Sequence, residues 1–302
     1  MAALGRTLIG AGVLLLLFIA YQLWGTNLAE AHNQHTLAQQ YQQAGPSGPT
    51  LPGFAVGVIT IPKISLQKYV VQGTNDDDLQ KGPGHYDGTP MPGQSGNVAI
   101  AGHRTTYGAP FYNLDKLGPG DQIVLDTPAH GHFVYSVISE RVVDPTDVSV
   151  VQPQPPGVTA TGPHPGYLLT LTTCTPRFSA AQRLVVFAQL ASAPAPPAGA
   201  PAPAPGTGGV LPGASGEAAS SPASSSSPST LLSGSSRAIA PTIAWGLGAA
   251  ALAVLAWLLS RPWRRWWGKG RGLPVYAIAA APFLVLLYFF FENVSRLLPA
   301  NY

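Results

Sequence analysis

The sequence predicts a mainly β domain, built as a barrel or a sandwich with few short helices, that is carried on one N-terminal and two C-terminal transmembrane helices. Three observations predict this. The 302-residue chain has three long apolar stretches. Between the first and the second lies a region of short β runs separated by glycine and proline. A segment made almost wholly of Ala, Pro, Gly and Ser separates that region from the last two apolar stretches.

The apolar stretches are residues 8–24, 239–259 and 273–291. About 20 residues at 1.5 Å each are needed to cross a hydrocarbon core of ~30 Å, and residues 239–259 meet this without a charge. The third stretch contains Pro274 and Pro282, which membrane helices tolerate where neighbouring helices satisfy the freed backbone groups. We therefore expect an N-terminal anchor over residues 1–28 and a C-terminal transmembrane hairpin over residues 237–302.

The loop between the last two spans indicates their orientation. Residues 260–272 hold no acidic residue and five basic ones, Arg261, Arg264, Arg265, Lys269 and Arg271. Such loops stay in the cytoplasm, and Arg6 indicates the same side for the N-terminus. Both signals place the β domain outside the cytoplasmic membrane. Residues 29–31 (AEA) have the form of a signal-peptide cleavage site, so cleavage of the first span stays open; the hairpin would still hold the domain.

Composition excludes some classes of function. With the basic cytoplasmic loop set aside, Lys and Arg no longer exceed Asp and Glu, so the formal charge of +3 gives no support for nucleic-acid binding. The acidic cluster at residues 76–78 lies at a predicted helix start, where adjacent carboxylates cap the helix more readily than they bind calcium. We expect no metal and no cofactor.

The remaining chain divides into two connecting segments and one domain. Residues 29–53 are polar and predict a short helical continuation of the first span and then a flexible tether. Residues 193–236 cannot bury enough apolar surface to offset their ordering entropy, so they predict a disordered linker. The domain is expected over residues 54–192.

Within the domain, alternation and β-branched residues predict seven strands, at residues 55–62, 66–73, 96–103, 121–127, 132–143, 166–174 and 182–190. Many short strands with turn signals between them are typical of a sandwich or a closed barrel. Short helical stretches are expected at residues 75–81 and 111–117.

The chain has a single cysteine, Cys174, in its exported part. Exported domains normally use cysteines in disulfide pairs, so a lone one needs another reason. It ends the apolar run LLTLTTC and precedes the break TPRFS, at a strand's end where sites are often built. A thiol nucleophile needs a proton partner and a cationic group for the developing oxyanion.

Among the seven histidines, His103 stands out because it directly follows the predicted strand NVAIAG. Arg183 starts the strand after the cysteine and would lie beside Cys174 if the two strands are antiparallel, whereas Arg177 lies in the intervening turn. Each residue alone also has an ordinary explanation. Cys174 fits a buried small apolar residue, His103 a surface residue, and Arg183 a solvated charge at a strand end.

These residues occur in motifs that resemble the sortase family. TLTTC resembles the signature TLxTC, in which the cysteine ends a barrel strand. The family's histidine follows an upstream strand, as in NVAIAGHRTTYGAPF, and its arginine lies on the next strand, as in CTPRFSAAQRLVV. The resemblance covers residues 54–190. GHRTTYGAPF, KGPGHYDGTPMPGQSGN and TLTTC are most similar to class E sortases of high-GC Gram-positive bacteria, which implies a closed eight-stranded sortase-type β-barrel.

The resemblance implies a cysteine transpeptidase. Cys174 would attack the Thr–Gly carbonyl of an LAxTG or LPxTG sorting signal, and His103 would protonate the leaving glycine. Arg183 would hold the substrate and stabilise the oxyanion with help from Thr173, and Tyr86 is implicated in preferring LAxTG. An amine of a cell-wall precursor would then resolve the thioester, which anchors a surface protein.

Four alternatives stay open. An L,D-transpeptidase would carry SxGC, where this chain has Thr172 and Thr173. A papain-like protease would place its histidine after the cysteine. A pilus-assembling sortase would carry an acidic–aromatic lid, and residues 30–53 hold no Asp, Trp or Phe. A non-enzymatic surface protein would retain its activity in Cys174→Ala.

Overall fold

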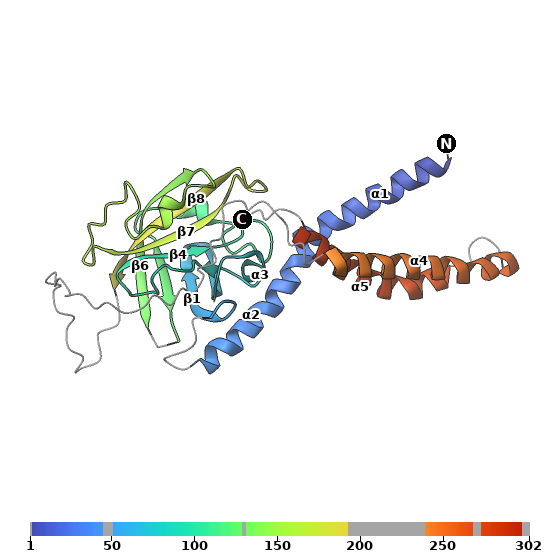
Figure 1. The fold of residues 1–302 in the computed structure, drawn as a ribbon, viewed down its shortest axis with the longest axis horizontal. Helices are drawn as coiled ribbons and strands as arrows, with labels where there is room; N and C mark the ends of the chain where they lie inside the picture. Colours follow the sequence, from blue (N-terminus) through green and yellow to red (C-terminus); the bar gives the residue numbers. More distant parts are fainter. Residues whose placement is uncertain (1, 45–50, 129–130, 193–238, 268–272, 298–302) are drawn as a thin grey trace, which may run out of the picture.

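The centre of the molecule is a closed barrel of eight strands, in the order β1-β2-β3-β4-β7-β8-β6-β5. The computed structural model describes residues 2–44, 51–128, 131–192, 239–267 and 273–297. Neighbouring strands run antiparallel except for the pairs β2–β3 and β4–β7, which are parallel. The barrel and the long helices beside it are seen in Figure 1. The predicted closed eight-stranded barrel is confirmed.

The strands are β1 (Ala55–Ile61), β2 (Leu66–Gln72), β3 (Gly84–His85), β4 (Gly96–Ala101), β5 (Gln122–Asp126), β6 (His132–Val143), β7 (Tyr167–Thr175) and β8 (Gln182–Ser192). Seven of them lie on predicted runs. The sequence did not predict β3, because a strand of two residues is too short to show an alternation of period 2.

Short helical turns connect the strands. They are η2 (Pro62–Ile64), α3 (Asp76–Leu79), η3 (Leu114–Lys116) and η4 (Val148–Val151). Asn75 caps α3 by accepting a hydrogen bond from the amide of Asp78 at 2.9 Å. The three aspartates occupy the first turn of this helix, as the sequence predicted.

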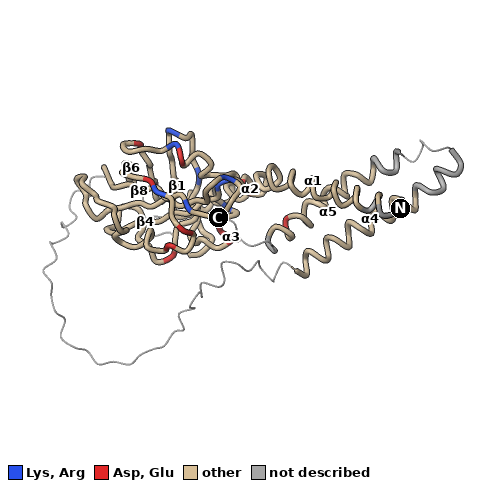
Figure 2. The backbone as a smooth tube through the Cα atoms, turned by 90° about the horizontal axis from the view of Figure 1, so that it is seen from above, with Lys and Arg blue, Asp and Glu red and all other residues tan. Residues whose placement is uncertain are grey.

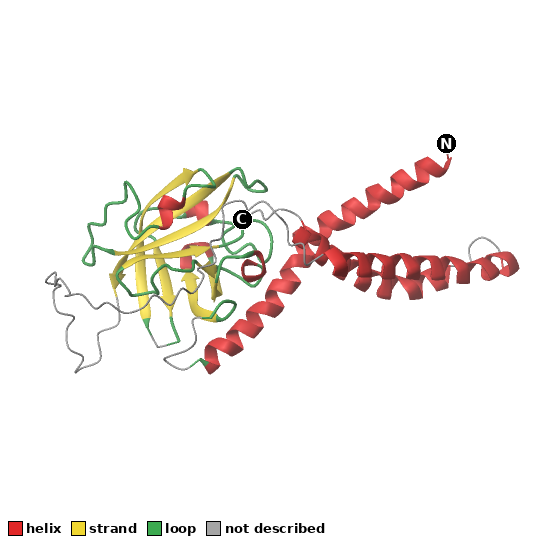
Figure 3. Ribbon diagram, viewed as in Figure 1, coloured by secondary structure: helices red, strands yellow, loops and turns green. Residues whose placement is uncertain are grey.

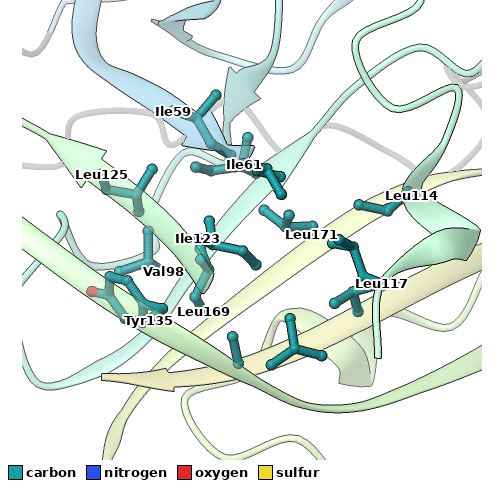
Figure 4. Packing of buried hydrophobic residues seen from close by; sticks show 14 of the residues in the cluster. Ile59, Ile61, Val98, Leu114, Leu117, Ile123, Leu125, Tyr135, Leu169 and Leu171 are labelled. Carbon is teal, nitrogen blue, oxygen red and sulfur yellow. The ribbon is translucent and has the colours of Figure 1, made fainter. Parts of the chain in front are cut away.

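The barrel interior holds the main hydrophobic core, to which every strand except β3 contributes side chains (Figure 4). On β7, the inward side chains are Leu169 and Leu171. Because successive side chains of a strand point to opposite faces, Thr170, Thr172 and Cys174 face outward. The same alternation on β8 turns Leu184 inward and Arg183 outward. Cys174 and Arg183 therefore lie on the outer face of the barrel.

The N-terminal part is one continuous helical run, formed by α1 (Ala2–Ala20), the π-helical turn η1 (Tyr21–Gly25) and α2 (Thr26–Gln43). The sequence predicted a short helical continuation of the first span and then a flexible tether over residues 29–53, and residues 29–43 belong to α2, which packs along the barrel (Figure 1). Gln34 holds α2 on the barrel, because its side-chain amide bonds to the backbone of Tyr69 and of Lys81. These partners lie on another part of the chain and are not visible in the local sequence.

At the other end, α4 (Ile239–Trp267) and α5 (Leu273–Leu297) form an antiparallel hairpin (Figure 3). The described residues include three helices long and apolar enough to cross a membrane, with candidate spans Leu8–Gln43, Ile239–Leu259 and Ile278–Ser295. In Figure 2 most of the coloured charged residues lie on the barrel. The predicted linker at 193–236 lies outside the described residues.

Candidate active site

The strand ladder places Cys174 beside Arg183. In the antiparallel pairing of β7 with β8, these two residues are direct partners. Direct partners have Cβ atoms about 4.5–5.5 Å apart and point to the same face. The adjacency that the sequence predicted for an antiparallel pair is therefore present. Arg183 is also held locally, because its Nη1 donates to the carbonyls of Ala180 (3.1 Å) and Gln182 (3.3 Å).

Cys174 is only 5% exposed. Burial raises the pKa of its thiol, and the guanidinium groups of Arg183 and Arg104 oppose that rise by favouring the thiolate. Two arginines thus act on the pKa of one thiol. Only Arg183 was predicted from the sequence.

Arg104 was missed because its partners are distant in sequence. Its Nη1 donates to the carbonyl of Cys174 at 3.1 Å, and its Nε donates to the carbonyl of Tyr112 at 3.1 Å. Its Nη2 forms an ion pair with Asp115 at 3.1 Å, and Asp115 also accepts two bonds from Arg177. Arg104 therefore ties the backbone of the cysteine to the turn that follows β4. Its place next to His103 in the motif GHR was the only available signal.

His103 lies just beyond the end of β4. The parallel pairing of β4 with β7 ends at Ala101 and Thr172, and the amide of Gly102 donates to the carbonyl of Thr172 at 3.1 Å. β4 therefore ends two residues before His103, beside the part of β7 that leads into Cys174. His103 is 6% exposed, and its ring packs on that of Tyr107 with centroids 5.2 Å apart.

Thr173 makes a hydrogen bond inside the protein. Its hydroxyl donates to the carbonyl of Gly102 at 2.7 Å, so its proton is used inside the protein. The residue is 1% exposed and lies on the inward side of β7. This hydrogen bond links β7, which carries Cys174, to Gly102, the residue before His103. An oxyanion contact from this hydroxyl would require that bond to break.

Tyr86 reaches the same outer face as Cys174. Its hydroxyl lies 3.0 Å from Oγ1 of Thr172, two residues before the cysteine on the outward side of β7. Burial raises the pKa of Tyr86, the positive charge of Arg183 opposes the rise, and a thiolate at Cys174 adds to it. The structure therefore gathers Tyr86, Cys174 and Arg183 into one neighbourhood. Within the described residues, no group of three or more His, Cys, Asp or Glu side chains is placed to hold a metal ion.

Comparison with known proteins shows that the chain is similar to sortases. The family profile of the sortase domain matches residues 59–191. Sortase SrtE1 of Streptomyces coelicolor is 39% identical over 201 residues, which cover 62% of this chain and 56% of that protein. Sortase SrtE2 of the same organism is 30% identical over 209 residues, which cover 63% of this chain and 81% of that protein. The chain thus spans little more than half the length of SrtE1.

Among solved structures, sortase E from Streptomyces avermitilis is 40% identical and matches 50% of this chain and 97% of that chain, with a TM-score of 0.43.

Proposed function

This chain belongs to the sortase family, and we propose that it is a membrane-held cysteine transpeptidase with Cys174, His103 and Arg183 as its catalytic residues. The observation that carries the proposal is the pairing of Cys174 with Arg183 on one outer face of the barrel, next to the end of the strand that leads into His103. A nucleophile, a proton carrier and a fixed cation are the three groups that acyl transfer through a thiol needs.

The proposed reaction has two steps. The Cys174 thiolate attacks the threonine carbonyl of a sorting signal of the LAxTG or LPxTG type, and the carbon–sulfur bond forms as the Thr–Gly amide bond breaks. The imidazolium of His103 gives its proton to the leaving glycine amine. An acceptor amine of a cell-wall precursor then attacks the thioester, its proton returns to His103, and the thiolate leaves.

Arg183 and Tyr86 are the proposed substrate-binding groups. The guanidinium stabilises the negative charge that develops on the substrate oxygen. Tyr86 borders the same face through its contact with Thr172, and in this proposal it reads the Ala or Pro position, two residues before the threonine of the signal. Thr173 contributes by holding Gly102 in this proposal, since its hydroxyl is engaged there.

The protonation states set a condition on this mechanism. With ordinary pKa values of about 8.5 for Cys and 6.5 for His, the ion pair is outnumbered about a hundredfold by the neutral pair. Because burial raises the pKa of the Cys174 thiol, the neutral pair is favoured further. The proposal is that a small competent fraction carries the reaction, and a bell-shaped pH–rate profile is expected.

The helices support a location at the membrane surface. The apolar run ends near Trp24, which is exposed and of the type that anchors helices at the headgroup level. From there α2 runs directly along the barrel. The catalytic domain would stand outside the membrane, with the basic loop at 260–272 inside, within reach of membrane-linked acceptors and of surface proteins that carry a sorting signal.

The test is mass spectrometry of the full chain in detergent micelles with LAxTG and LPxTG peptides and a glycine-based amine. A ligated product, with a thioacyl adduct on the only cysteine, is expected with the LAxTG peptide in excess over LPxTG. Cys174→Ala should abolish both species. Cleavage without ligation points to a hydrolase or to the wrong acceptor, and the absence of an adduct with either peptide contradicts the proposed substrate.

A further inference from the structure

The loop that carries His103 has an unusual backbone. In this His103 loop (residues 103–111), three consecutive residues are left-handed: Tyr107 (φ 48°), Gly108 (φ 73°) and Ala109 (φ 42°). For residues other than glycine this region costs roughly 1–2 kcal/mol each, and it persists only where the surroundings enforce it. Something outside the loop must therefore hold Tyr107 in place.

The first support comes from α2. Thr26 is fully buried, and its Oγ1 accepts the amide hydrogen of Tyr107 at 3.2 Å. Asn27 accepts the amide hydrogen of Gly108 at 2.9 Å through Oδ1. The approach is close, because a Cβ added at Gly108 would lie 2.6 Å from the carboxylate of Glu30. The backbone amides of Tyr107 and Gly108 belong to no regular secondary structure, and these two hydrogen bonds give them partners.

The second support comes from α5. The hydroxyl of Tyr107 lies 3.3 Å from Oγ of Ser295, whose own proton goes to the carbonyl of Glu292 at 2.7 Å. Tyr107 is therefore the donor to Ser295. The end of α5 is itself fixed to η1, where Tyr21 packs against Tyr288 and Phe291 with ring centroids 5.4 and 5.8 Å apart.

The far side of Tyr107 meets His103. The two rings pack at 5.2 Å and 35°, and Tyr107 is 7% exposed. We propose that Tyr107 is a positioning residue for His103, and that the membrane-side ends of α2 and α5 hold it through Thr26 and Ser295. The C-terminal hairpin then helps to position His103, in addition to anchoring the chain. This inference rests on the proposed function of His103 as the proton carrier.

Backbone pairing fixes the position of Cys174, whereas the position of His103 on its loop depends on side-chain contacts. A shift of about 1 Å in a reacting group costs about 10²-fold in rate. Loss of the Tyr107 ring should therefore lower turnover while the binding of the peptide, which uses the barrel face, stays unchanged. A residue with only a structural role would lower the amount of active protein and leave the turnover per active thiol the same.

The experiment uses the full chain in detergent micelles and two readouts. The first is the rate of Cys174 alkylation by iodoacetamide as a function of pH, which reports one thiol because the chain has a single cysteine. The second is kcat and KM for an LAxTG peptide, normalised to titrated thiol. Tyr107→Ala should move the alkylation profile toward that of His103→Ala and lower kcat about 10²-fold at unchanged KM.

The two supports are tested separately. Thr26→Val and Ser295→Ala should each lower kcat about fivefold, the effect of one lost neutral hydrogen bond. Tyr107→Phe keeps the ring on His103 and should match Ser295→Ala, and the double variant should be no worse than either single one because both remove the same bond. The Thr26 hydroxyl also donates to the carbonyl of Gln22, four residues earlier, at 2.9 Å. Thr36→Val is therefore the matched control, because the Thr36 hydroxyl donates in the same way to the carbonyl of His32 but on an exposed face.

The outcomes separate the two hypotheses. If the wild-type chain forms no adduct with the peptide, the proposed function fails, and the alkylation profiles still decide the role of Tyr107. The inference is overturned if the pH profile of Cys174 alkylation equals that of the wild type in all three variants, Tyr107→Phe, Thr26→Val and Ser295→Ala. It is also overturned if His103→Ala leaves the wild-type profile unchanged, or if Thr36→Val has the same effect as Thr26→Val.

Discussion

The ladder between β7 and β8 and the His103 loop hold their catalytic candidates in two different ways. Cys174 and Arg183 are direct partners in a regular antiparallel pairing that continues over eight residue pairs. His103 lies on an irregular loop that depends on side chains from α2, α5 and β7. Backbone pairing sets the relative position of Cys174 and Arg183 almost regardless of side-chain identity, whereas single side chains set the position of His103. Substitutions should therefore affect the two regions differently.

The largest effect should follow from removing the cation of the ladder. Arg183→Ala should lower kcat/KM about 10²–10³-fold, because one preorganised group for the oxyanion is lost. The ladder itself should persist, since its backbone bonds do not involve the guanidinium. Peptide kinetics and circular dichroism of the full chain check both parts. Arg141→Ala is the control, because that guanidinium lies over Phe187 at 4.9 Å and contacts no candidate residue within the described structure.

The same variant makes a prediction about pH. Arg183 opposes the rise in the pKa of the Cys174 thiol, so its loss should shift the alkylation profile to higher pH. A pKa raised on folding means that the thiolate is less favourable in the folded chain than in the unfolded one. The associated stability is present below the ordinary thiol pKa of about 8.5 and decreases as the pH rises above it. Arg183→Ala should make that decrease steeper in thermal unfolding followed against pH.

The next effect concerns the link between the two regions. Arg104→Met removes the bonds to the carbonyls of Cys174 and Tyr112 and the ion pair with Asp115. The expected loss is about 2 kcal/mol of unfolding free energy. Arg104 is buried and its bonds are lost, whereas Asp115 is 41% exposed and is not left as a buried unpaired charge. Denaturant unfolding in micelles measures it. Arg177→Met, which removes the more exposed partner of Asp115, should cost less than about 1 kcal/mol. Equal losses would contradict the bracing role of Arg104.

A smaller effect is expected on the side of the loop. Gly108→Ala puts a Cβ on a left-handed residue, and this atom would lie 2.6 Å from the Glu30 carboxylate. We expect a loss of about 1–2 kcal/mol and a fall in kcat at unchanged KM, because α2 or the loop must shift. Gly118→Ala is the control, since a Cβ there meets nothing within 4 Å. An unchanged kcat would show that the approach of α2 does not set the position of His103.

The smallest effect tests the fastening between the regions. Thr173→Val removes the bond to the carbonyl of Gly102 and should cost about 1 kcal/mol of stability. Thr173→Ser keeps the hydroxyl and should restore most of it. If Thr173→Val instead lowers kcat/KM by 10²-fold or more at unchanged stability, the hydroxyl acts on the oxyanion, as the sequence suggested.

The sequence by itself determined seven of the eight strands, the three apolar helices and the cysteine, histidine and arginine to consider, and the closed barrel followed from the family resemblance. Alternation along a strand and the length of an apolar run are local properties, so they are readable without coordinates. Motif order gave the same three residues through the family resemblance. Only the tertiary structure decided that residues 29–43 pack as a helix on the barrel, that Arg104 reaches Cys174, and that Tyr107 joins His103 to α2 and α5. The hydrogen bonds that make these contacts join residues 35 to 188 positions apart, and no local pattern records which distant side chain will complete a bond.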